Sequence, residues 1–274
     1  MANKCLILGK GYIGSELHCY LGCAITANKI NSFQDIYAVL DEHKPDTLIN
    51  CVGHTGLNNV DDCELVPDKT LQANTFLPIL LAEATYRRKI KFIHISSGCI
   101  YHYDYEKGKP IAESQIPDFY DLFYSRSKIY TENVLTNLAK YHNILIARIR
   151  VPLDNKPHPK NVLTKLIQYK KVINVPNSVT YIPDFIKALK HLLQMDARGV
   201  YNVVNKKPLY YNRLMNVYQK YVPDFKYEII DFKKLKLVRT NLILSTQKLT
   251  NSGFNIRSTD EILDECVKNY IKYS

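Results

Sequence analysis

The sequence predicts an α/β protein, with a doubly wound parallel sheet followed by a smaller C-terminal region. Three observations predict this fold class. Short apolar runs alternate with helix-like patterns through the first half of the chain, a glycine-rich turn directly follows the first run, and prolines interrupt the alternation after residue 151. Strands separated by helices of roughly 10–20 residues need crossover connections, which favour parallel pairing.

The expected strands are short apolar runs, and the expected helices carry apolar residues at helical spacing. The strands are expected at Lys4–Leu8, Cys23–Ala27, Thr47–Val52, Lys91–Ser97 and Ile144–Val151. The helices are expected at Gly11–Tyr20, Ser32–His43, Pro67–Arg88 and Tyr120–Tyr141.

The second half is less regular, and Pro152, Pro157 and Pro159 mark a boundary. We expect a first domain at residues 1–155 and a second region at residues 156–274. A helix at Ile182–Gln194 and a strand from Gly199 predict that residues 179–204 return to the first domain. The tail from Asp260 to Tyr273 is amphipathic.

The composition is that of an ordinary soluble globular protein, with 46% hydrophobic and 23% charged residues among 274. No apolar run approaches the roughly 20 residues of a membrane helix. The N-terminus also lacks the long apolar region of a signal peptide. We therefore expect a cytoplasmic protein without a membrane partner. The seven Cys form no CxxC pair, which argues against a disulfide framework and a metal site.

The formal net charge is +11, and the basic residues are dispersed. The positive net charge fits a polyanionic small-molecule ligand. A general composition rich in Lys, Asn and Ile explains this charge equally well. Beyond this diffuse charge the sequence has no DNA- or RNA-binding signature, so we expect no nucleic-acid partner.

A GxGxxG motif, Gly9-Lys10-Gly11-Tyr12-Ile13-Gly14, stands between the first strand and the first helix. Glycines let the backbone turn tightly and approach a pyrophosphate, which is stabilised at the helix N-terminus. In this strand–turn–helix context the motif predicts a Rossmann-type fold that binds a dinucleotide, with these six residues at the cofactor.

The residues after the second strand favour NADP(H) over NAD(H). NAD enzymes usually carry an acidic residue there, which binds the ribose 2′-hydroxyl. Here the sequence reads Ala27-Asn28-Lys29, and Lys10 lies inside the glycine turn. Cations suit a 2′-phosphate, and Asn28 is a candidate contact. The alternative is that both lysines are solvated surface residues.

Tyr124 and Lys128 form a YxxxK motif. Positions i and i+4 share one face of a helix, and a nearby ammonium stabilises a phenolate. Such a pair can deliver a proton to a carbonyl oxygen while a nicotinamide supplies hydride. Ser97 ends the expected strand Lys91–Ser97, at the edge where open α/β sheets bind ligands, so its hydroxyl can reach the same oxygen. His94, within that strand, is interpreted as a core histidine whose hydrogen bonds are satisfied.

Together, GxGxxG, the strand end Asn50-Cys51-Val52-Gly53, Ser97 and YxxxK resemble the extended short-chain dehydrogenases/reductases over almost the whole chain. The resemblance implies that Ser97, Tyr124 and Lys128 form a reductase triad. It also implies that Tyr124 and Lys128 contact the cofactor. Further cofactor contacts are implied at Cys51, Val52, Gly53 and Val151.

A closer resemblance lies in the segments SSGCIYHYD, ESQIPDF, FYSRSK, ARIRVP and HPKNVLTKLIQYKKVINVPNS. They are similar to the bifunctional UDP-4-keto-6-deoxy-D-glucose 3,5-epimerase/4-reductases of plants and giant viruses. That family makes UDP-L-rhamnose and epimerises with a Cys and a Lys, which correspond here to Cys99 and Lys165. Inversion alpha to a ketone needs two proton-carrying groups on opposite faces. Which of the two is base and which is acid stays open.

Thr55, Asn58, Asn161 and Arg239 are candidate contacts to the nucleotide sugar, whose base can be uracil or thymine. Two other functions stay open: a reductase without epimerase activity, and a non-enzymatic NADP-binding regulatory subunit. A homodimer through the helices that begin near Pro67 and Tyr120 is also possible.

Overall fold

The computed structural model describes residues 4–57, 59–105, 108–232, 235, 238 and 240–274. These residues form two compact units. The first comprises the described residues of Met1–Ile100, Pro117–Arg148 and Leu192–Tyr201, and the second comprises those of Tyr101–Ile116, Ile149–His191 and Asn202–Ser274.

The unit boundaries differ from the expected domain limits. The main boundary falls at 148/149 instead of 155, and the segment that returns to the first unit is Leu192–Tyr201. Tyr101–Ile116 belongs to the second unit, although we expected it in the first. The reason is a long-range bridge: Ile111 pairs with Leu244, and the Ile111 N–H donates to the Ile243 carbonyl at 2.8 Å.

The sheet of the first unit has six strands in the order β2-β1-β3-β4-β5-β9. β1 pairs in parallel with both β2 and β3, and β3 pairs in parallel with β4. The strands are β1 Cys5–Leu8, β2 Ala24–Thr26, β3 Thr47–Asn50, β4 Lys91–Ser97, β5 Ile144–Ile149 and β9 Gly199–Asn202. The expected doubly wound α/β class is confirmed. Because the chain order reverses between β1 and β3, their carboxyl ends flank the crevice where such sheets bind ligands.

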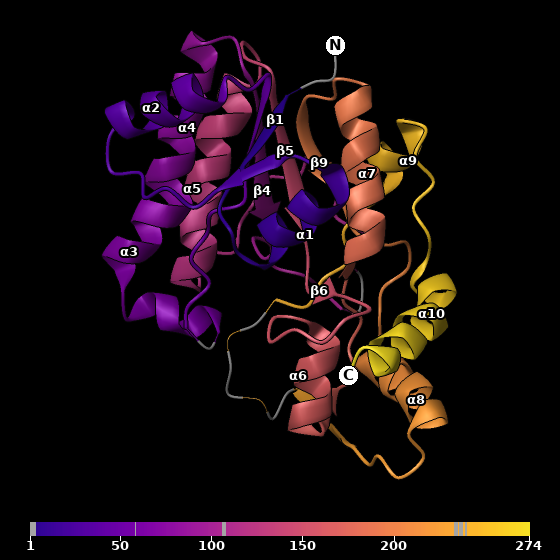
Figure 1. Cartoon of the computed structure of the whole chain (residues 1–274). Helices are drawn as coiled ribbons and strands as arrows, with labels where there is room; N and C mark the ends of the chain where they lie inside the picture. The colour runs from indigo at the N-terminus through magenta and orange to yellow at the C-terminus, as the bar shows by residue number, and fades with distance from the viewer. Residues whose placement is uncertain (1–3, 58, 106–107, 233–234, 236–237, 239) are drawn as a thin grey trace. The chain divides into compact units, whose positions relative to one another are not determined.

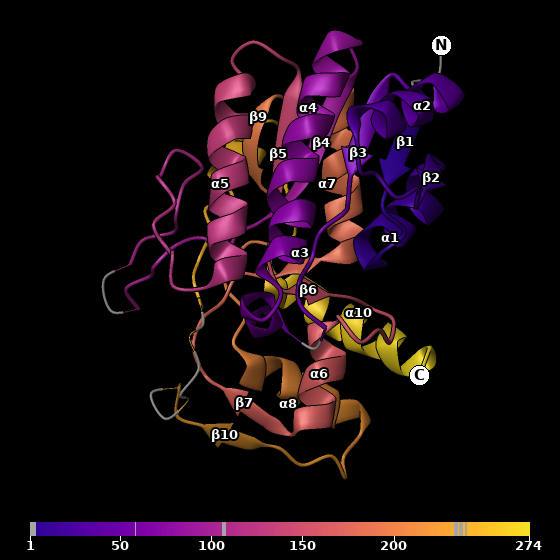
Figure 2. The ribbon, with the colours of Figure 1, turned by 90° about the vertical axis from the view of Figure 1, so that its left-hand side faces the viewer.

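Helices cover both faces of this sheet. α1 lies on one face, and α2, α4 and α5 lie on the other (Figures 1 and 2). Their bounds are α1 Tyr12–Leu21, α2 Phe33–His43, α4 Leu77–Arg87 and α5 Phe123–Leu138. Between β3 and α4 lie η1 Val60–Glu64, α3 Pro67–Leu71 and a π-helical turn, η2 Gln72–Phe76. The core under α2 and α4 is mainly aliphatic, with Leu6, Ile36, Leu48 and Leu81 each at most 1% exposed.

The second unit contains two small sheets of two strands each, β10-β7 and β6-β8. Its strands are β6 Pro152–Leu153, β7 Lys171–Ile173, β8 Thr180–Tyr181 and β10 Glu228–Ile230. Its helices are α6 Val162–Tyr169, α8 Tyr211–Tyr221, α9 Gln247–Asn251 and α10 Thr259–Lys272, and α7 Ile182–Gln194 begins in it and ends in the first unit. A separate core packs α6, α8 and α10 around residues such as Leu163, Leu214 and Ile262.

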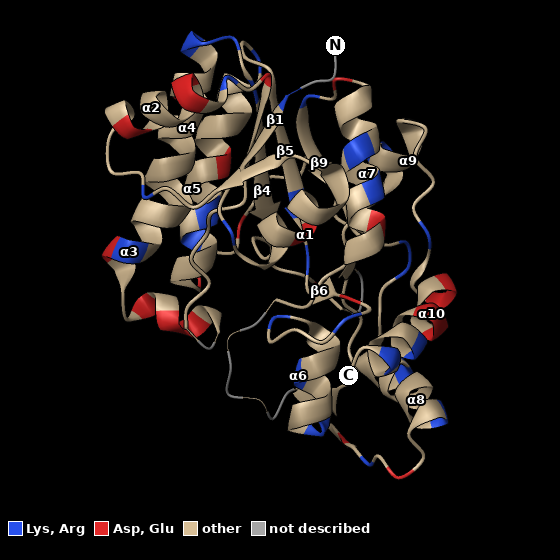
Figure 3. Cartoon of the chain, viewed as in Figure 1, with Lys and Arg blue, Asp and Glu red and all other residues tan. Residues whose placement is uncertain are grey.

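The basic side chains are not concentrated on any single helix or strand. Figure 3 shows Lys and Arg distributed along the elements of each unit, with acidic residues grouped at η1 and along α10. Within the described ranges, no helix is both long enough and apolar enough to cross a membrane.

Candidate active site

The glycine turn has the backbone geometry that its motif predicts. Gly9 has φ of 107°, and a Cβ there would lie 3.0 Å from the Val52 side chain. A Cβ on Gly14 would collide with the Gly9 carbonyl oxygen. Gly11, the N-cap of α1, is different, because a Cβ built there meets no atom within 4 Å. Gly9 and Gly14 are therefore needed for packing, whereas Gly11 keeps space open at the helix N-terminus, where an anion is stabilised.

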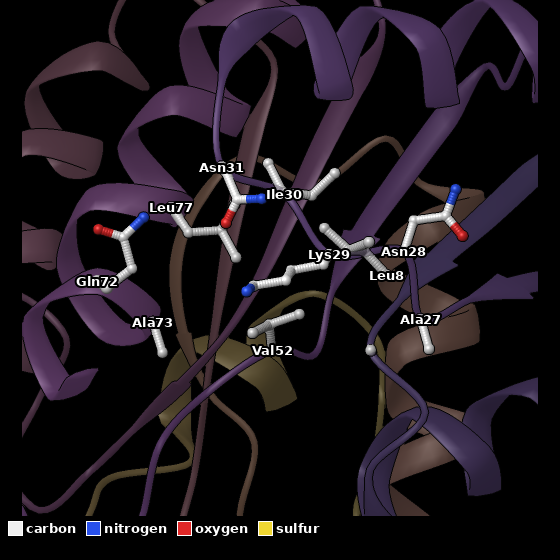
Figure 4. Close-up of a pocket in the computed structure, with 11 residues that line it drawn as sticks. Leu8, Ala27, Asn28, Lys29, Ile30, Asn31, Val52, Gln72, Ala73 and Leu77 are labelled. Atoms are coloured by element: carbon white, nitrogen blue, oxygen red, sulfur yellow. The ribbon is translucent and has the colours of Figure 1, made fainter.

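A pocket of about 280 Å³ lies beside this turn (Figure 4). It is lined by Leu8 and Gly9, residues 27–31, Val52, and Gln72, Ala73 and Leu77. Figure 4 shows the Lys29 side chain directed into the pocket, toward the side on which Asn31 and Gln72 lie. Asn28 is fixed at the rim, because its Oδ1 accepts from Thr26 Oγ1 at 2.9 Å. Lys10 is exposed and is not among the lining residues, so Lys29 is the lysine that the pocket presents to a ligand.

Tyr124 and Lys128 lie in the first two turns of α5, 7% and 4% exposed. The start of this helix is held by Glu64 of η1. The Glu64 carboxylate accepts from the Phe123 N–H at 2.6 Å and from the Arg126 guanidinium at 3.1 Å. A carboxylate at a helix N-terminus is favourable both as a hydrogen-bond acceptor and as a charge. Glu64 therefore positions the turn that carries Tyr124.

Burial lowers the pKa of Lys128 to about 8, while the nearby Glu132 and Cys63 raise it. A Cβ on Gly53 would lie 3.5 Å from Lys128 Nζ and 3.4 Å from Asn74 Oδ1. The Lys128 ammonium on α5 therefore lies next to the residues that follow β3. These residues are expected at the cofactor.

Ser97 is the last residue of β4 and Cys99 follows it, and this segment is hydrogen-bonded to α5. The Cys99 N–H donates to Ser97 Oγ at 3.1 Å, and Ser125 Oγ donates to the Cys99 carbonyl at 2.6 Å. Ser97 is buried, and the Cys99 residue is half-buried. The first unit thus holds four of the five predicted catalytic residues, with Ser97 and Cys99 at the carboxyl end of β4 and Tyr124 and Lys128 in α5.

The remaining predicted residues lie in both units. Lys165 is half-buried on α6 of the second unit, and Thr55 is half-buried after β3 in the first. Val151, in the second unit, has φ of 32°, a strained value for a β-branched residue. Asn58 and Arg239 fall outside the described residues.

Asn161 is fully buried and caps the N-terminus of α6. Its Oδ1 accepts from the Leu163 and Asp154 N–H groups, and its Nδ2 donates to the Asp154 and Lys156 carbonyls. Because both polar atoms of the amide are used within the chain, the structure favours a loop-positioning role over a nucleotide contact.

Two other expectations need correction. The helix expected at Pro67–Arg88 is interrupted by η2, where Asn74 Nδ2 donates to Ser127 Oγ at 3.1 Å and Thr75 Oγ1 donates to the Ser127 carbonyl at 2.9 Å. These contacts with α5 have no periodic signal in the sequence. His94 is only half satisfied: Nδ1 contacts Asn50 Nδ2 at 3.2 Å, whereas its buried Nε2 has no hydrogen-bond partner in the described structure. Burial and the nearby Lys128 hold the His94 pKa well below its usual value.

Sequence reasoning missed Glu64 and the side chain of Ser125. Glu64 lies 59 residues before the helix start that it caps, so local pattern cannot reveal it. Ser125 stands inside the YxxxK motif, and its position next to Tyr124 was the available signal. Among the described side chains, no group of three or more His, Cys, Asp or Glu could hold a metal ion.

Comparison with known families shows which protein family this chain belongs to. Residues 6–207 match the model of the RmlD substrate binding domain. The chain belongs to this family. The expected relationship to the extended short-chain dehydrogenases/reductases is thereby confirmed.

Several proteins are similar to this RmlD-family chain. The bifunctional dTDP-4-dehydrorhamnose 3,5-epimerase/dTDP-4-dehydrorhamnose reductase of Arabidopsis thaliana is 29% identical over 94% of this chain and 90% of its own length. A UDP-rhamnose synthase from Acanthamoeba polyphaga mimivirus superposes with a TM-score of 0.89 at 23% identity, covering 97% of this chain and 99% of the other. A dTDP-4-dehydrorhamnose reductase of Bacillus anthracis, solved with NADP, superposes with a TM-score of 0.82 at 18% identity over the full length of both chains. The two structures show that the fold is shared.

Proposed function

We propose that this chain uses NADPH to reduce a nucleotide-linked 4-keto sugar, and that it epimerises the sugar at C3 and C5 beforehand. The proposed overall reaction converts UDP-4-keto-6-deoxy-D-glucose to UDP-L-rhamnose. The observation that carries the proposal is that Ser97 and Cys99, at the carboxyl end of β4, are joined by hydrogen bonds to each other and to Ser125 in the first turn of α5, the helix that carries Tyr124 and Lys128.

The fit of the cofactor rests on the first unit. Space is open over Gly11 at the N-terminus of α1, and Lys29 enters the adjacent pocket, which contains no acidic side chain among its lining residues. These features suit a pyrophosphate and a 2′-phosphate. The bound nicotinamide would supply hydride to C4 of the sugar. The Bacillus anthracis relative, solved with NADP, supports the same choice of cofactor.

The chain's own residues account for the proton transfers in the reduction. Tyr124 donates its phenolic proton to the C4 oxygen as hydride arrives, and the Lys128 ammonium stabilises the phenolate that is left. The Ser97 hydroxyl binds the same oxygen and orients the ketone.

Epimerisation requires loss and return of the protons at C3 and C5, which are acidic because they lie alpha to the C4 ketone. Cys99 and Lys165 are the proposed pair that removes and returns these protons. The Arabidopsis relative, whose name contains both activities and which covers 94% of this chain, supports this finer assignment. A cytoplasmic location and a homodimer are likewise predictions.

One incubation tests the proposal. Purified protein, UDP-4-keto-6-deoxy-D-glucose and NADPH are mixed in D2O, and the product is analysed by NMR. We expect NADPH to be consumed and deuterium to appear at C3 and C5. Consumption without deuterium would leave a plain 4-ketoreductase. Bound NADPH without turnover of UDP or dTDP substrate would favour the regulatory-subunit alternative.

A further inference from the structure

A buried charged cluster lies one helical turn beyond Lys128. Glu132 follows Lys128 by four residues on α5, and the Glu132 carboxylate accepts from Ser96 Oγ of β4 at 2.5 Å. The same carboxylate pairs with Arg148 of β5, whose guanidinium nitrogens lie 2.6 and 2.8 Å from Oε2. The Glu132 and Arg148 side chains are each at most 3% exposed.

Burying the charged Glu132–Arg148 pair costs free energy. Removing two charges from water carries a penalty of several kcal/mol per ion, and a buried ion pair often stabilises a fold no better than apolar residues of equal volume. The proposed chemistry uses neither Glu132 nor Arg148. Glu132 does, however, share a helix face with Lys128, the buried ammonium that the chemistry does use, because residues i and i+4 are neighbours on a helix, and its charge raises the pKa of Lys128.

The titratable groups that interact with Lys128 come from three elements. Glu132 lies on α5 itself, Cys63 lies on η1, and His94 lies on β4. Tyr124 lies four residues before Lys128 on α5 and so shares its helix face. Arg148 of β5 is reached through Glu132. His94 is held neutral by burial, and a buried thiol carries no charge at neutral pH, so Glu132 is the one anion among these described groups.

We propose that Glu132, fixed by Ser96 and Arg148, is a positioning residue that keeps Lys128 in its charged form beside Tyr124. The two hydrogen-bond partners prevent the carboxylate from rotating away, and Arg148 balances its charge, so that the anion persists in the core. This inference rests on the proposed reductase function for its kinetic consequence, but the charge of Lys128 can be measured without any substrate.

The sign of the effect follows from Coulomb's law. An anion favours the protonated lysine, so removing the Glu132 charge lowers the pKa of Lys128 from about 8. A neutral lysine no longer stabilises the Tyr124 phenolate. The alkaline limb of the kcat/KM profile therefore moves to lower pH, while activity below the shifted pKa is retained.

The decisive experiment compares wild type with Glu132→Gln, which keeps the size and polarity of the side chain. Lysine is labelled with 13C at Cε, the Lys128 resonance is assigned with Lys128→Met, and its titration is followed by NMR. We expect the Lys128 midpoint to fall by at least about one pH unit. With the keto sugar and NADPH, kcat/KM at pH 8 should then fall about fivefold, with little change at pH 6.

Asp184→Asn is the matched control, because the buried Asp184 carboxylate forms an ion pair at 2.7 Å with the half-buried Arg257 in the second unit. It should leave the Lys128 midpoint unchanged. If Glu132→Gln does not fold, the double variant Glu132→Gln/Arg148→Met removes both charges and should still lower the midpoint.

An unshifted Lys128 midpoint, or an activity loss by the same factor at every pH, would overturn the inference and leave Glu132 a structural residue. Absence of turnover in wild type would instead refute the proposed function, and the NMR titration would still decide the role of Glu132.

Discussion

At the scale of single residues, the chemistry depends on how each reactive side chain is held. Cys99 is fixed through its backbone, by Ser97 on its N–H and by Ser125 on its carbonyl. Its thiol can therefore be removed without disturbing those two hydrogen bonds. Lys29 is exposed, yet its side chain enters the pocket beside the glycine turn. Both residues can be tested by substitutions that leave the fold intact.

Cys99→Ala should separate the two proposed activities. Because general acid–base groups contribute about 10²–10⁴-fold, deuterium incorporation from D2O should fall by about that factor. Reduction of substrate that is already epimerised should continue at the wild-type rate. Cys19→Ala, which removes an exposed thiol on α1, serves as the control and should change neither rate. Equal loss of both activities in Cys99→Ala would contradict separate roles for Cys99 and the triad.

Lys29→Asp should reverse the cofactor preference. A carboxylate at this place repels a 2′-phosphate and can accept from a ribose 2′-hydroxyl. A charge-assisted hydrogen bond contributes about 1.5–3 kcal/mol, so the Kd for NADPH should rise about tenfold or more and the Kd for NADH should fall. Nucleotide fluorescence titration measures both constants. Lys10→Asp is the comparison, since Lys10 does not line the pocket. A larger effect at Lys10 would place the 2′-phosphate at the glycine turn instead.

At the scale of elements, the site is assembled from strand ends and helix starts. The residues proposed for cofactor binding and reduction lie in the turn between β1 and α1, after β3, at the carboxyl end of β4 and in the first two turns of α5. Close packing of the glycine turn allows α1 to begin beside β1. The π-helical turn η2 binds Ser127 of α5 and holds Asn74 near Lys128.

Gly14→Ala and Gly11→Ala should separate packing from cofactor binding. The added methyl at Gly14 collides with the Gly9 carbonyl, so overpacking should cost about 1–3 kcal/mol of unfolding free energy and weaken NADPH binding. The methyl at Gly11 meets no protein atom, so stability should be kept while NADPH binding is lost. Urea unfolding and NADPH titration of both variants test this. Tight NADPH binding by Gly11→Ala would contradict the proposed pyrophosphate position.

At the scale of the whole molecule, two compact units each have a hydrophobic core of their own. The first unit is also held by polar contacts between segments far apart in the chain. The buried Lys91 ammonium, at the start of β4, donates to Asn143, to Asp196 at 2.7 Å and to the Ala197 carbonyl. This cluster fixes the returning segment Leu192–Tyr201 to the sheet.

Asp196 should make stability depend on pH in the acid range. Hydrogen bonds from Asn143 and Lys91 lower the pKa of Asp196 to about 2, below the unfolded value near 3.9. Its contribution is therefore complete above about pH 4 and is lost as pH falls toward 2. Asp196 is 57% exposed, so screening limits the contribution to roughly 1 kcal/mol. Asp196→Asn should be less stable than wild type at pH 7 in urea titrations, and the two should converge near pH 2. A constant difference across this range would contradict the assignment.

The sequence by itself determined the features that arise between near neighbours in the chain. Alternating apolar runs and helical patterns predict the α/β class, and glycines at fixed spacing predict the turn between β1 and α1. The four-residue spacing of Tyr124 and Lys128 places both on one helix face. The tertiary structure alone decided that Glu64 caps α5 and that Glu132 meets Ser96 and Arg148. These contacts join residues that are far apart in the sequence, so no local periodicity in the sequence could predict them. The short strands β6, β7, β8 and β10 escaped prediction for a related reason, because two or three residues are too few to show a period of two.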